Sequence, residues 1–121
     1  MRILLCLLVL GASPAWAEWV DVAETRSSLL YIDPSTIRKD GNFRRVWEMS
    51  DLKQRTGGAM SRRILNEYDC KEERRRVISN TSHSEQMGHG SILISDDKLG
   101  EWQYIAPKTA SSFVLEIVCA K

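Results

Sequence analysis

Two cysteines, Cys70 and Cys119, limit the folds open to this chain more than any other feature of its sequence. The remaining cysteine, Cys6, lies in an N-terminal apolar stretch with the pattern of an export signal. A single pair of cysteines in an exported protein predicts a disulfide, because the destination compartment is oxidising. The bond would close a loop of about fifty residues and add on the order of 4 kcal/mol of stability. Two free buried thiols are the alternative.

The export signal is predicted from three features of the N-terminus. Arg2 supplies a positive charge, residues 3–10 are continuously apolar, and Ala15-Trp16-Ala17 has the small-x-small pattern of a cleavage site. Such a short apolar run cannot span a bilayer, which needs about 20 residues. We therefore expect residues 1–17 to be removed as a signal peptide, leaving residues 18–121 as one domain. A buried N-terminal helix is the alternative.

The residues around Cys6 bear on where the exported protein resides. Leu5 precedes this cysteine, at a position where a lipoprotein signal needs a small residue. We therefore expect no lipid anchor and no transmembrane segment after processing. The predicted location is periplasmic or secreted, and display on the cell surface remains open.

The charge of the processed chain is balanced. Of the 17 basic residues, Arg2 leaves with the signal, so 16 basic residues face 16 acidic ones. A neutral domain has no long-range field to attract nucleic acid or an anionic membrane. Nucleic-acid binding is therefore not expected, and any basic site must be local.

Alternating and β-branched segments predict an α+β domain with a single antiparallel β-sheet of about six strands. A short helix at the C-terminus would pack on this sheet and be held there by the disulfide. The helix assignment over residues 111–120 rests on Ser112 and Glu116, although its many β-branched residues also suit a strand. The candidate strands are 19–23, 29–32, 43–52, 62–70, 74–79, 91–95 and 101–105.

Charges alternate around one predicted hairpin, and they indicate its register. If the loop has four residues, Asp69 lies opposite Arg74 and Glu67 lies opposite Arg76. Both pairs would be cross-strand ion pairs worth a few tenths of a kcal/mol each at the surface. A three-residue loop would shift every pairing.

Two further segments carry turn signals. Asp33-Pro34 predicts one helical turn through Ile37, with the Asp33 side chain capping the amides that follow. Gly57-Gly58 predicts a mobile loop over residues 53–59, and residues 80–90 are polar and contain glycine, which also favours a loop.

No catalytic constellation is present, so we do not expect an enzyme. The sequence has no free nucleophilic cysteine after processing, no glycine-rich phosphate loop and no serine in a nucleophile elbow. His83 and His89 are candidate axial ligands for a haem, because imidazole ligates iron. Two solvated loop histidines are the alternative, and the fallback ligands are Tyr68, Tyr104 and Met87.

Arginines are concentrated on three predicted neighbouring strands. Alternate members, Arg74 and Arg76 among them, would form a basic stripe able to bind carboxylates, sulfates or propionates. A solvated face balanced by acidic residues is the alternative. Trp19, Trp47 and Trp102 suit core positions in a domain of this size. The arginines are Arg44, Arg45, Arg62, Arg63, Arg74, Arg75 and Arg76, and the acids are Glu48, Glu67, Asp69, Glu72 and Glu73.

Several short motifs occur in an order that resembles the surface-adhesin protein E family of Gram-negative bacteria. They are Trp19, Tyr31-Ile32-Asp33-Pro34-x-Thr36-Ile37, Val46-Trp47, Glu67-Tyr68-Asp69-Cys70 with Arg74 and Arg76, Glu101-Trp102-x-x-Ile105-x-Pro107, and Val118-Cys119. The resemblance implies an antiparallel sheet with a C-terminal helix held on one side by the disulfide, and a possible homodimer. It also implies a non-enzymatic adhesin that binds host matrix or plasma proteins, or haem.

A second function fits the absence of a lipoprotein signal. The surface adhesin of the family is a lipoprotein, whereas this sequence lacks the signal for a lipid anchor. A periplasmic accessory or inhibitor protein that docks one envelope protein partner is therefore the alternative.

Overall fold

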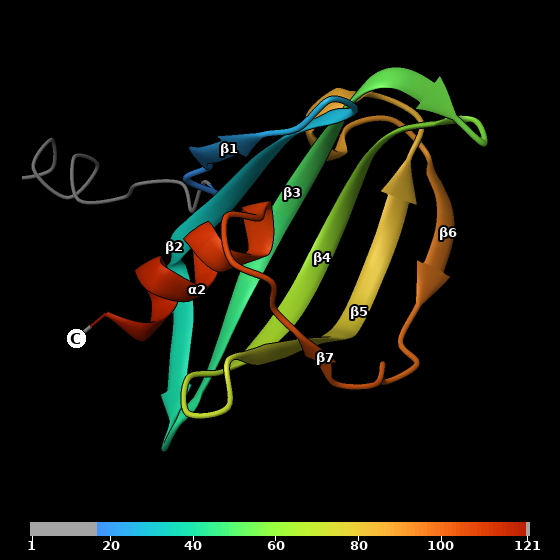
Figure 1. The fold of residues 1–121 in the computed structure, drawn as a ribbon. Coiled ribbons are helices and arrows are strands. Elements are labelled where there is room, and N and C mark those ends of the chain that lie inside the picture. Colours follow the sequence, from blue (N-terminus) through green and yellow to red (C-terminus); the bar gives the residue numbers. More distant parts are fainter. Residues whose placement is uncertain (1–16, 121) are drawn as a thin grey trace, which may run out of the picture.

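One antiparallel sheet forms the centre of the protein, as the alternating segments predict. The structure, a computed structural model, describes residues 17–120, and Figure 1 shows the sheet with a single long helix on one side. The predicted signal peptide lies almost entirely outside the described residues and stays a prediction. The elements are β1 (Val20–Glu24), β2 (Ser28–Asp40), β3 (Phe43–Thr56), β4 (Ala59–Asp69), β5 (Arg74–His83), a 3-10 turn η1 (Gln86–Gly88), β6 (Ile92–Asp96), β7 (Gln103–Tyr104) and α2 (Ala110–Cys119).

The strands follow one another across the sheet in chain order. The order is β1-β2-β3-β4-β5-β6, and the short β7 pairs with the free end of the β5 edge. Every pairing is antiparallel, and the connections from β1 to β6 each join neighbouring strands, whereas the chain after β6 returns to pair β7 with β5. The α+β fold with about six strands and a C-terminal helix is therefore confirmed.

The central strands are longer than predicted. β3 and β4 continue to a two-residue turn at Gly57-Gly58, with Thr56 opposite Ala59. Both glycines have positive φ angles, 56° and 84°, which is the backbone that a tight hairpin turn between twisted strands requires. The predicted mobile loop over residues 53–59 is therefore wrong. The predicted polar loop also begins too early, because β5 extends to His83.

The charged hairpin has the predicted register. Asp69 pairs with Arg74 and Glu67 pairs with Arg76, leaving a four-residue loop. The side chains form the expected ion pairs, with Arg74 Nε 2.9 Å from Asp69 Oδ2 and Arg76 Nη2 2.8 Å from Glu67 Oε1. The alternating charges therefore identified the correct pairing.

The segment after Asp33 forms an irregular strand instead of the predicted helical turn. Register with β3 breaks between Asp33 and Arg38, so that the chain bulges within β2. The Asp33 carboxylate accepts hydrogen bonds from the Ser35 amide at 3.1 Å and the Ser35 hydroxyl at 2.6 Å. Thr36 Oγ1 accepts from the Trp47 amide at 3.0 Å. Side chains thus replace the lost strand pairing, and a helix is not needed to satisfy the backbone.

Replacing Asp33 with alanine should lower the free energy of unfolding by about 1 kcal/mol, as removal of a side-chain cap does. Asp33 is buried, and it also accepts a hydrogen bond from the Glu18 amide at 3.2 Å. Chemical denaturation measures the change, with exposed Asp96→Ala as the control. Equal stability of the Asp33→Ala variant and the wild type would show that the bulge does not need this carboxylate.

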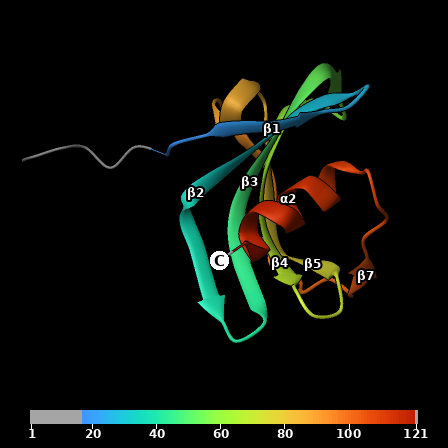
Figure 2. The same ribbon diagram turned by 60° about the vertical axis from the view of Figure 1, so that its left-hand side comes forward.

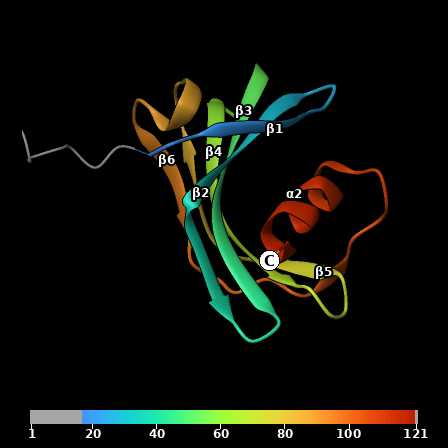
Figure 3. The same cartoon turned by 90° about the vertical axis from the view of Figure 1, so that its left-hand side faces the viewer.

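Helix α2 covers one face of the sheet, as Figures 2 and 3 show. Thr109 caps the helix by a reciprocal pair of hydrogen bonds with Ser112. The helix therefore begins at Ala110, directly after this cap, and not at residue 111 as predicted. Val114 and Val118 are its buried residues, whereas Phe113 and Ile117 are exposed.

The core lies between the helix and the sheet. Its buried members are Ile32, Val46, Tyr68, Val114 and Val118. The predicted disulfide between Cys70 and Cys119 joins the end of β4 to the last residue of α2. The two cysteines lie 49 residues apart in sequence.

Candidate functional site

The face of the sheet opposite α2 gathers arginine and aromatic side chains. In antiparallel sheets, directly paired residues point to the same side, and alternate residues point to opposite sides. Val46 on β3 and its diagonal neighbour Tyr68 on β4 pack beneath α2. The odd-numbered residues of β3, and the residues of β4 and β5 that pair with them, therefore point away from the helix. We call this surface the arginine–tryptophan face; it comprises Phe43, Arg45, Trp47, Arg63, Glu67, Asp69, Arg74, Arg76 and Trp102.

Trp102 is fixed on this face by three neighbouring side chains. The guanidinium carbons of Arg74 and Arg76 lie 4.5 and 4.3 Å from its ring centroid. Phe43 stacks on it with ring centroids 5.8 Å apart. Trp102 immediately precedes β7, which pairs with the edge of β5. The residue after β7, Ile105, packs against the core on the helix side. The short β7 therefore positions the tryptophan.

Two carboxylates hold three of the four arginines of this face in place. Glu67 accepts hydrogen bonds from Arg45 at 3.1 Å and from Arg76 at 2.9 Å, and Asp69 binds Arg74. The Glu67 side chain is only 7% exposed, so these are not the surface pairs that the alternating charges suggested. The arginines are thus oriented by buried partners, and part of the predicted basic stripe is neutralised. The candidate ligand-binding residues Arg74 and Arg76 lie side by side around Trp102.

The pKa of Asp69 reflects this arrangement. Desolvation by burial acts to raise it, but the amides of Glu72 and Lys71 and the Arg74 guanidinium outweigh that effect. The pKa of Asp69 is therefore lowered, and the carboxylate stays ionised at physiological pH. The pair with Arg74 persists through the neutral range.

Arg63 is the most available cation of the face. Its guanidinium lies 4.4 Å from the ring centroid of Trp47, and the residue is exposed. Among the ion pairs within residues 17–120, none includes Arg63.

Trp47 and Trp102 are half-buried rather than core residues, which corrects the expectation for both; Trp19 is also half-buried. Their partly exposed rings can contact a partner.

The two candidate haem ligands lie far from Arg74 and Arg76. His83 is nine residues along β5 from Arg74, a separation on the order of 30 Å in an extended strand. It is buried, with Nε2 2.7 Å from Thr81 Oγ1, and burial together with the charges of Arg63 and His89 lowers the pKa of its imidazole. His89 is exposed. The structure separates the histidines from Arg74 and Arg76, and haem binding stays a prediction.

The fallback ligands are also dispersed. Tyr68 is fully buried, Met87 is half-buried in η1, and Tyr104 is exposed in β7. Within residues 17–120, no group of three or more histidine, cysteine, aspartate or glutamate side chains is placed to hold a metal ion.

Glu48 lies on the opposite side, beneath the helix. The sequence placed it among acids that balance a solvated arginine face, but it is 3% exposed and accepts a hydrogen bond of 2.6 Å from the Tyr68 hydroxyl. Desolvation raises the pKa of Glu48 above its ordinary value, against the opposing effects of Tyr68, Asn66 and Arg75. Glu48 is thus a core residue and takes no part in the arginine–tryptophan face.

The sequence matches the family model of surface-adhesin protein E over residues 19–120. This chain belongs to the surface-adhesin protein E family. The predicted resemblance is therefore confirmed, and the match extends across nearly the whole described domain. No curated protein matches the sequence.

Solved structures of Haemophilus influenzae protein E share the fold. Crystal form II superposes with a TM-score of 0.70 at 15% identity, covering 89% of this chain and 91% of that chain. A second structure of the protein has a TM-score of 0.68 at 15% identity, covering 89% and 88%. Protein E from non-typeable Haemophilus influenzae has a TM-score of 0.67 at 14% identity, covering 89% and 79%. Among residues 17–120, no helix is long and apolar enough to cross a membrane.

Proposed function

We propose that this protein is an exported, non-enzymatic adhesin that binds a host extracellular protein through its arginine–tryptophan face. Family membership supports an adhesin-like surface protein. The observation that carries the proposal is the set of arginines and tryptophans fixed on the sheet face that the helix leaves uncovered.

Arginine and tryptophan are among the side chains that contribute most to protein–protein affinity. A guanidinium that is already held by Glu67 or Asp69 and stacked on an aromatic ring loses little side-chain entropy on binding. Arg63 and the half-exposed Arg45 also favour a partner with an acidic surface. The proposed partner is therefore a host matrix or plasma protein that presents carboxylates to this face.

The alternative is a periplasmic accessory or inhibitor protein that uses the same face to dock one envelope protein. Leu5 before Cys6 favours it, because that sequence does not suit a lipid anchor. Protease accessibility on intact cells separates the two functions: degradation of the protein on whole cells supports adhesion, and protection until the outer membrane is opened supports the periplasmic function.

A homodimer also remains a prediction, and β6 offers a surface for it. All five residues of this edge strand are exposed, including Ile92, Leu93 and Ile94. An exposed apolar edge strand readily pairs with another strand. An antiparallel contact between two β6 strands would therefore extend the sheet across two copies.

Arg63→Glu tests the docking proposal, and the adjacent Arg62 provides the control. The two residues follow each other on β4 and point to opposite sides of the sheet. Charge reversal at Arg63 should weaken binding to immobilised matrix and plasma proteins, purified free of glycosaminoglycan, by about tenfold, or ~1.4 kcal/mol. Arg62→Glu should leave this binding unchanged. Equal losses in both variants, measured by surface plasmon resonance, would contradict docking through the arginine–tryptophan face.

A further inference from the structure

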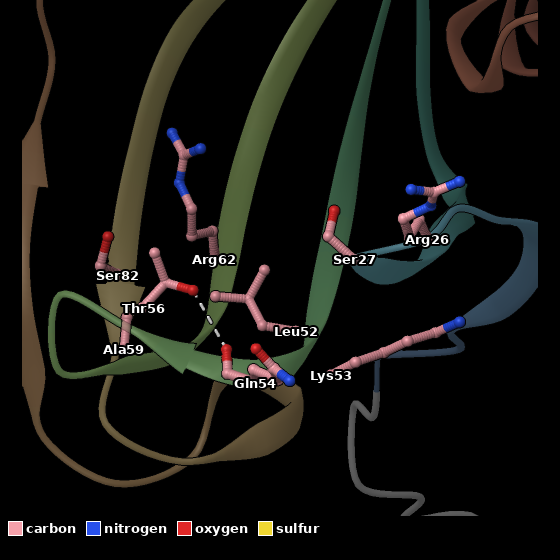
Figure 4. A pocket seen from close by; sticks show the side chains of 9 residues that line it. All are labelled: Arg26, Ser27, Leu52, Lys53, Gln54, Thr56, Ala59, Arg62 and Ser82. Carbon is pink, nitrogen blue, oxygen red and sulfur yellow. Dashed lines mark hydrogen bonds between the residues drawn. The ribbon is translucent and has the colours of Figure 1, made fainter.

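A pocket of about 730 Å³ lies on the helix side of the sheet, at the end that α2 does not cover. Figure 4 shows the side chains that line it. They come from the β1–β2 turn and from three strands: Arg26, Ser27, Leu52, Lys53, Gln54, Thr56, Ala59, Arg62 and Ser82.

Sheet register places the pocket on the face opposite the arginine–tryptophan face. Arg62 pairs with Ser50 on β3 and with Ser82 on β5. Ser50 lies two and four residues beyond Glu48 and Val46, whose side chains are buried on the helix side. The pocket and the helix therefore share one face, and Arg62 and Arg63 serve different surfaces.

The pocket is cationic, although the processed chain is neutral. Three of its nine lining residues, Arg26, Lys53 and Arg62, are basic, and within the described chain none of the nine is acidic. Lys53 pairs with Glu24, which lies outside the lining set. Arg62 donates only a long hydrogen bond of 3.5 Å, from Nη2 to Asn80 Oδ1. No ion pair among residues 17–120 includes Arg26 or Arg62. Both guanidiniums are exposed and available to a ligand.

The cations lie on two sides of the pocket. Figure 4 shows Arg62 on one side and Arg26 and Lys53 on the other, with Leu52 and Ser27 between them. A ligand that uses both sides needs anionic groups at separated positions on one body. The body itself meets an apolar side chain, hydroxyl groups and the Gln54 amide, the mixture that a sugar ring with its C–H faces and hydroxyl groups satisfies.

We propose that this pocket binds a sulfated saccharide, with sulfate groups held by Arg62 on one side and by Arg26 and Lys53 on the other. Guanidinium groups bind tetrahedral oxyanions through paired, charge-assisted hydrogen bonds. The volume lies within the range of small-ligand pockets, about 300–1,000 Å³, and suits a short saccharide better than a lone ion. The site lies beyond the proposed docking surface and does not depend on it.

The test uses the processed full-length domain and a heparin tetrasaccharide in titration calorimetry at low ionic strength, where charges are least screened. We expect binding by the wild type and a loss of about tenfold or more in the Arg26→Glu, Arg62→Glu double variant, because two of the three cations are reversed. Arg63→Glu, on the other face, should bind the saccharide as the wild type does. This variant also distinguishes the two proposals, because it should lose the protein partner and keep the sugar.

Two further ligands identify which part of the saccharide is recognised. An unsulfated hyaluronan tetrasaccharide, which carries carboxylates only, should bind at least about tenfold more weakly. Inorganic phosphate should compete only weakly, since one ion cannot reach both sides. Equal binding of the unsulfated sugar, full displacement by phosphate at matched concentration, or an equal loss in Arg63→Glu would overturn the proposal. No binding of heparin by a wild type whose fold is confirmed by circular dichroism would overturn it as well.

Discussion

Replacing both Cys70 and Cys119 with serine should lower the free energy of unfolding by about 4 kcal/mol. The disulfide closes a sequence separation of 49 residues, and the loss of a cross-link of that span frees a large conformational entropy in the unfolded chain. A domain of this size has a total stability of about 5–10 kcal/mol. The double variant should therefore be close to its folding limit at physiological temperature.

The C-terminal helix should be the first element to detach in this variant. α2 has ten residues, too few to be stable alone in water, and it contributes Val114 and Val118 to the core. Amide hydrogen exchange should show faster exchange in α2 than in β3 and β4, whose registers do not involve the disulfide. Urea denaturation measures the stability.

A reductant provides the matched control for this prediction. Reduction should destabilise the wild type by about as much as the substitutions do and leave the double variant unchanged. A double variant as stable as the oxidised wild type, with protected α2 amides, would show that packing alone holds the helix on the sheet.

The sequence allowed the charged hairpin and the disulfide to be predicted because both depend on local or unique information. Glu67, Asp69, Arg74 and Arg76 alternate with the two-residue period of a strand, and only one loop length pairs opposite charges. Cys70 and Cys119 have no competing partner if residues 1–17, which contain Cys6, are removed as predicted. Each inference needed little knowledge of the tertiary structure.

The predictions of secondary structure are wrong where the same residues suit two local structures and tertiary contacts select one of them. Gly57-Gly58 suits a mobile loop and a tight hairpin turn equally well, and pairing of β3 with β4 selects the turn. Polar residues 80–83 look like a loop, but they pair with β4 on one side and β6 on the other. Asp33-Pro34 can cap a helix, yet β3 holds the segment extended.

The candidate sites show the same limit. Arg74 and Arg76 were recognised as candidate ligand-binding residues, but their contact with Trp102 depends on a return of the chain along the β5 edge. The basic pocket combines Arg26, Lys53 and Arg62, which come from three elements and share no local pattern. Neither cluster follows from spacing in the sequence.

Glu48→Gln should stabilise the protein at neutral pH by about 1–3 kcal/mol, the range that an incompletely compensated buried polar or charged group costs. The Glu48 carboxylate is buried beneath α2, and Tyr68 donates a hydrogen bond of 2.6 Å to it. Glutamine keeps an oxygen to accept this bond and removes the charge that burial disfavours. Desolvation and the Glu48 charge also raise the pKa of Tyr68, so the tyrosine remains the donor.

The pH dependence gives the sharper test, because its sign is opposite to that of ordinary acid denaturation. Burial raises the pKa of Glu48 in the folded state, so at intermediate pH the folded protein binds more protons at this site than the unfolded chain. The contribution of Glu48 to the free energy of unfolding therefore becomes less favourable as pH rises from the pKa of Glu48 in the unfolded chain to its higher pKa in the folded protein. Below the unfolded pKa the penalty is absent. Asp69, whose pKa is lowered, has the reverse effect: its contribution is present at neutral pH and is lost as pH falls through its folded pKa.

Comparison of Glu48→Gln with the wild type isolates the first effect, because Asp69 is common to both proteins. The stability advantage of the variant should be greatest at neutral pH and should shrink as acid protonates Glu48 in the wild type. Glu116→Gln, on the exposed side of α2, is the matched control for the loss of one glutamate charge. Urea denaturation from pH 4 to pH 8 measures all three proteins across the relevant range. An advantage that is constant with pH would show that Glu48 does not titrate in this range. A variant that is less stable at neutral pH would mean that the charge itself is needed, with Arg75 as a cation that stabilises it.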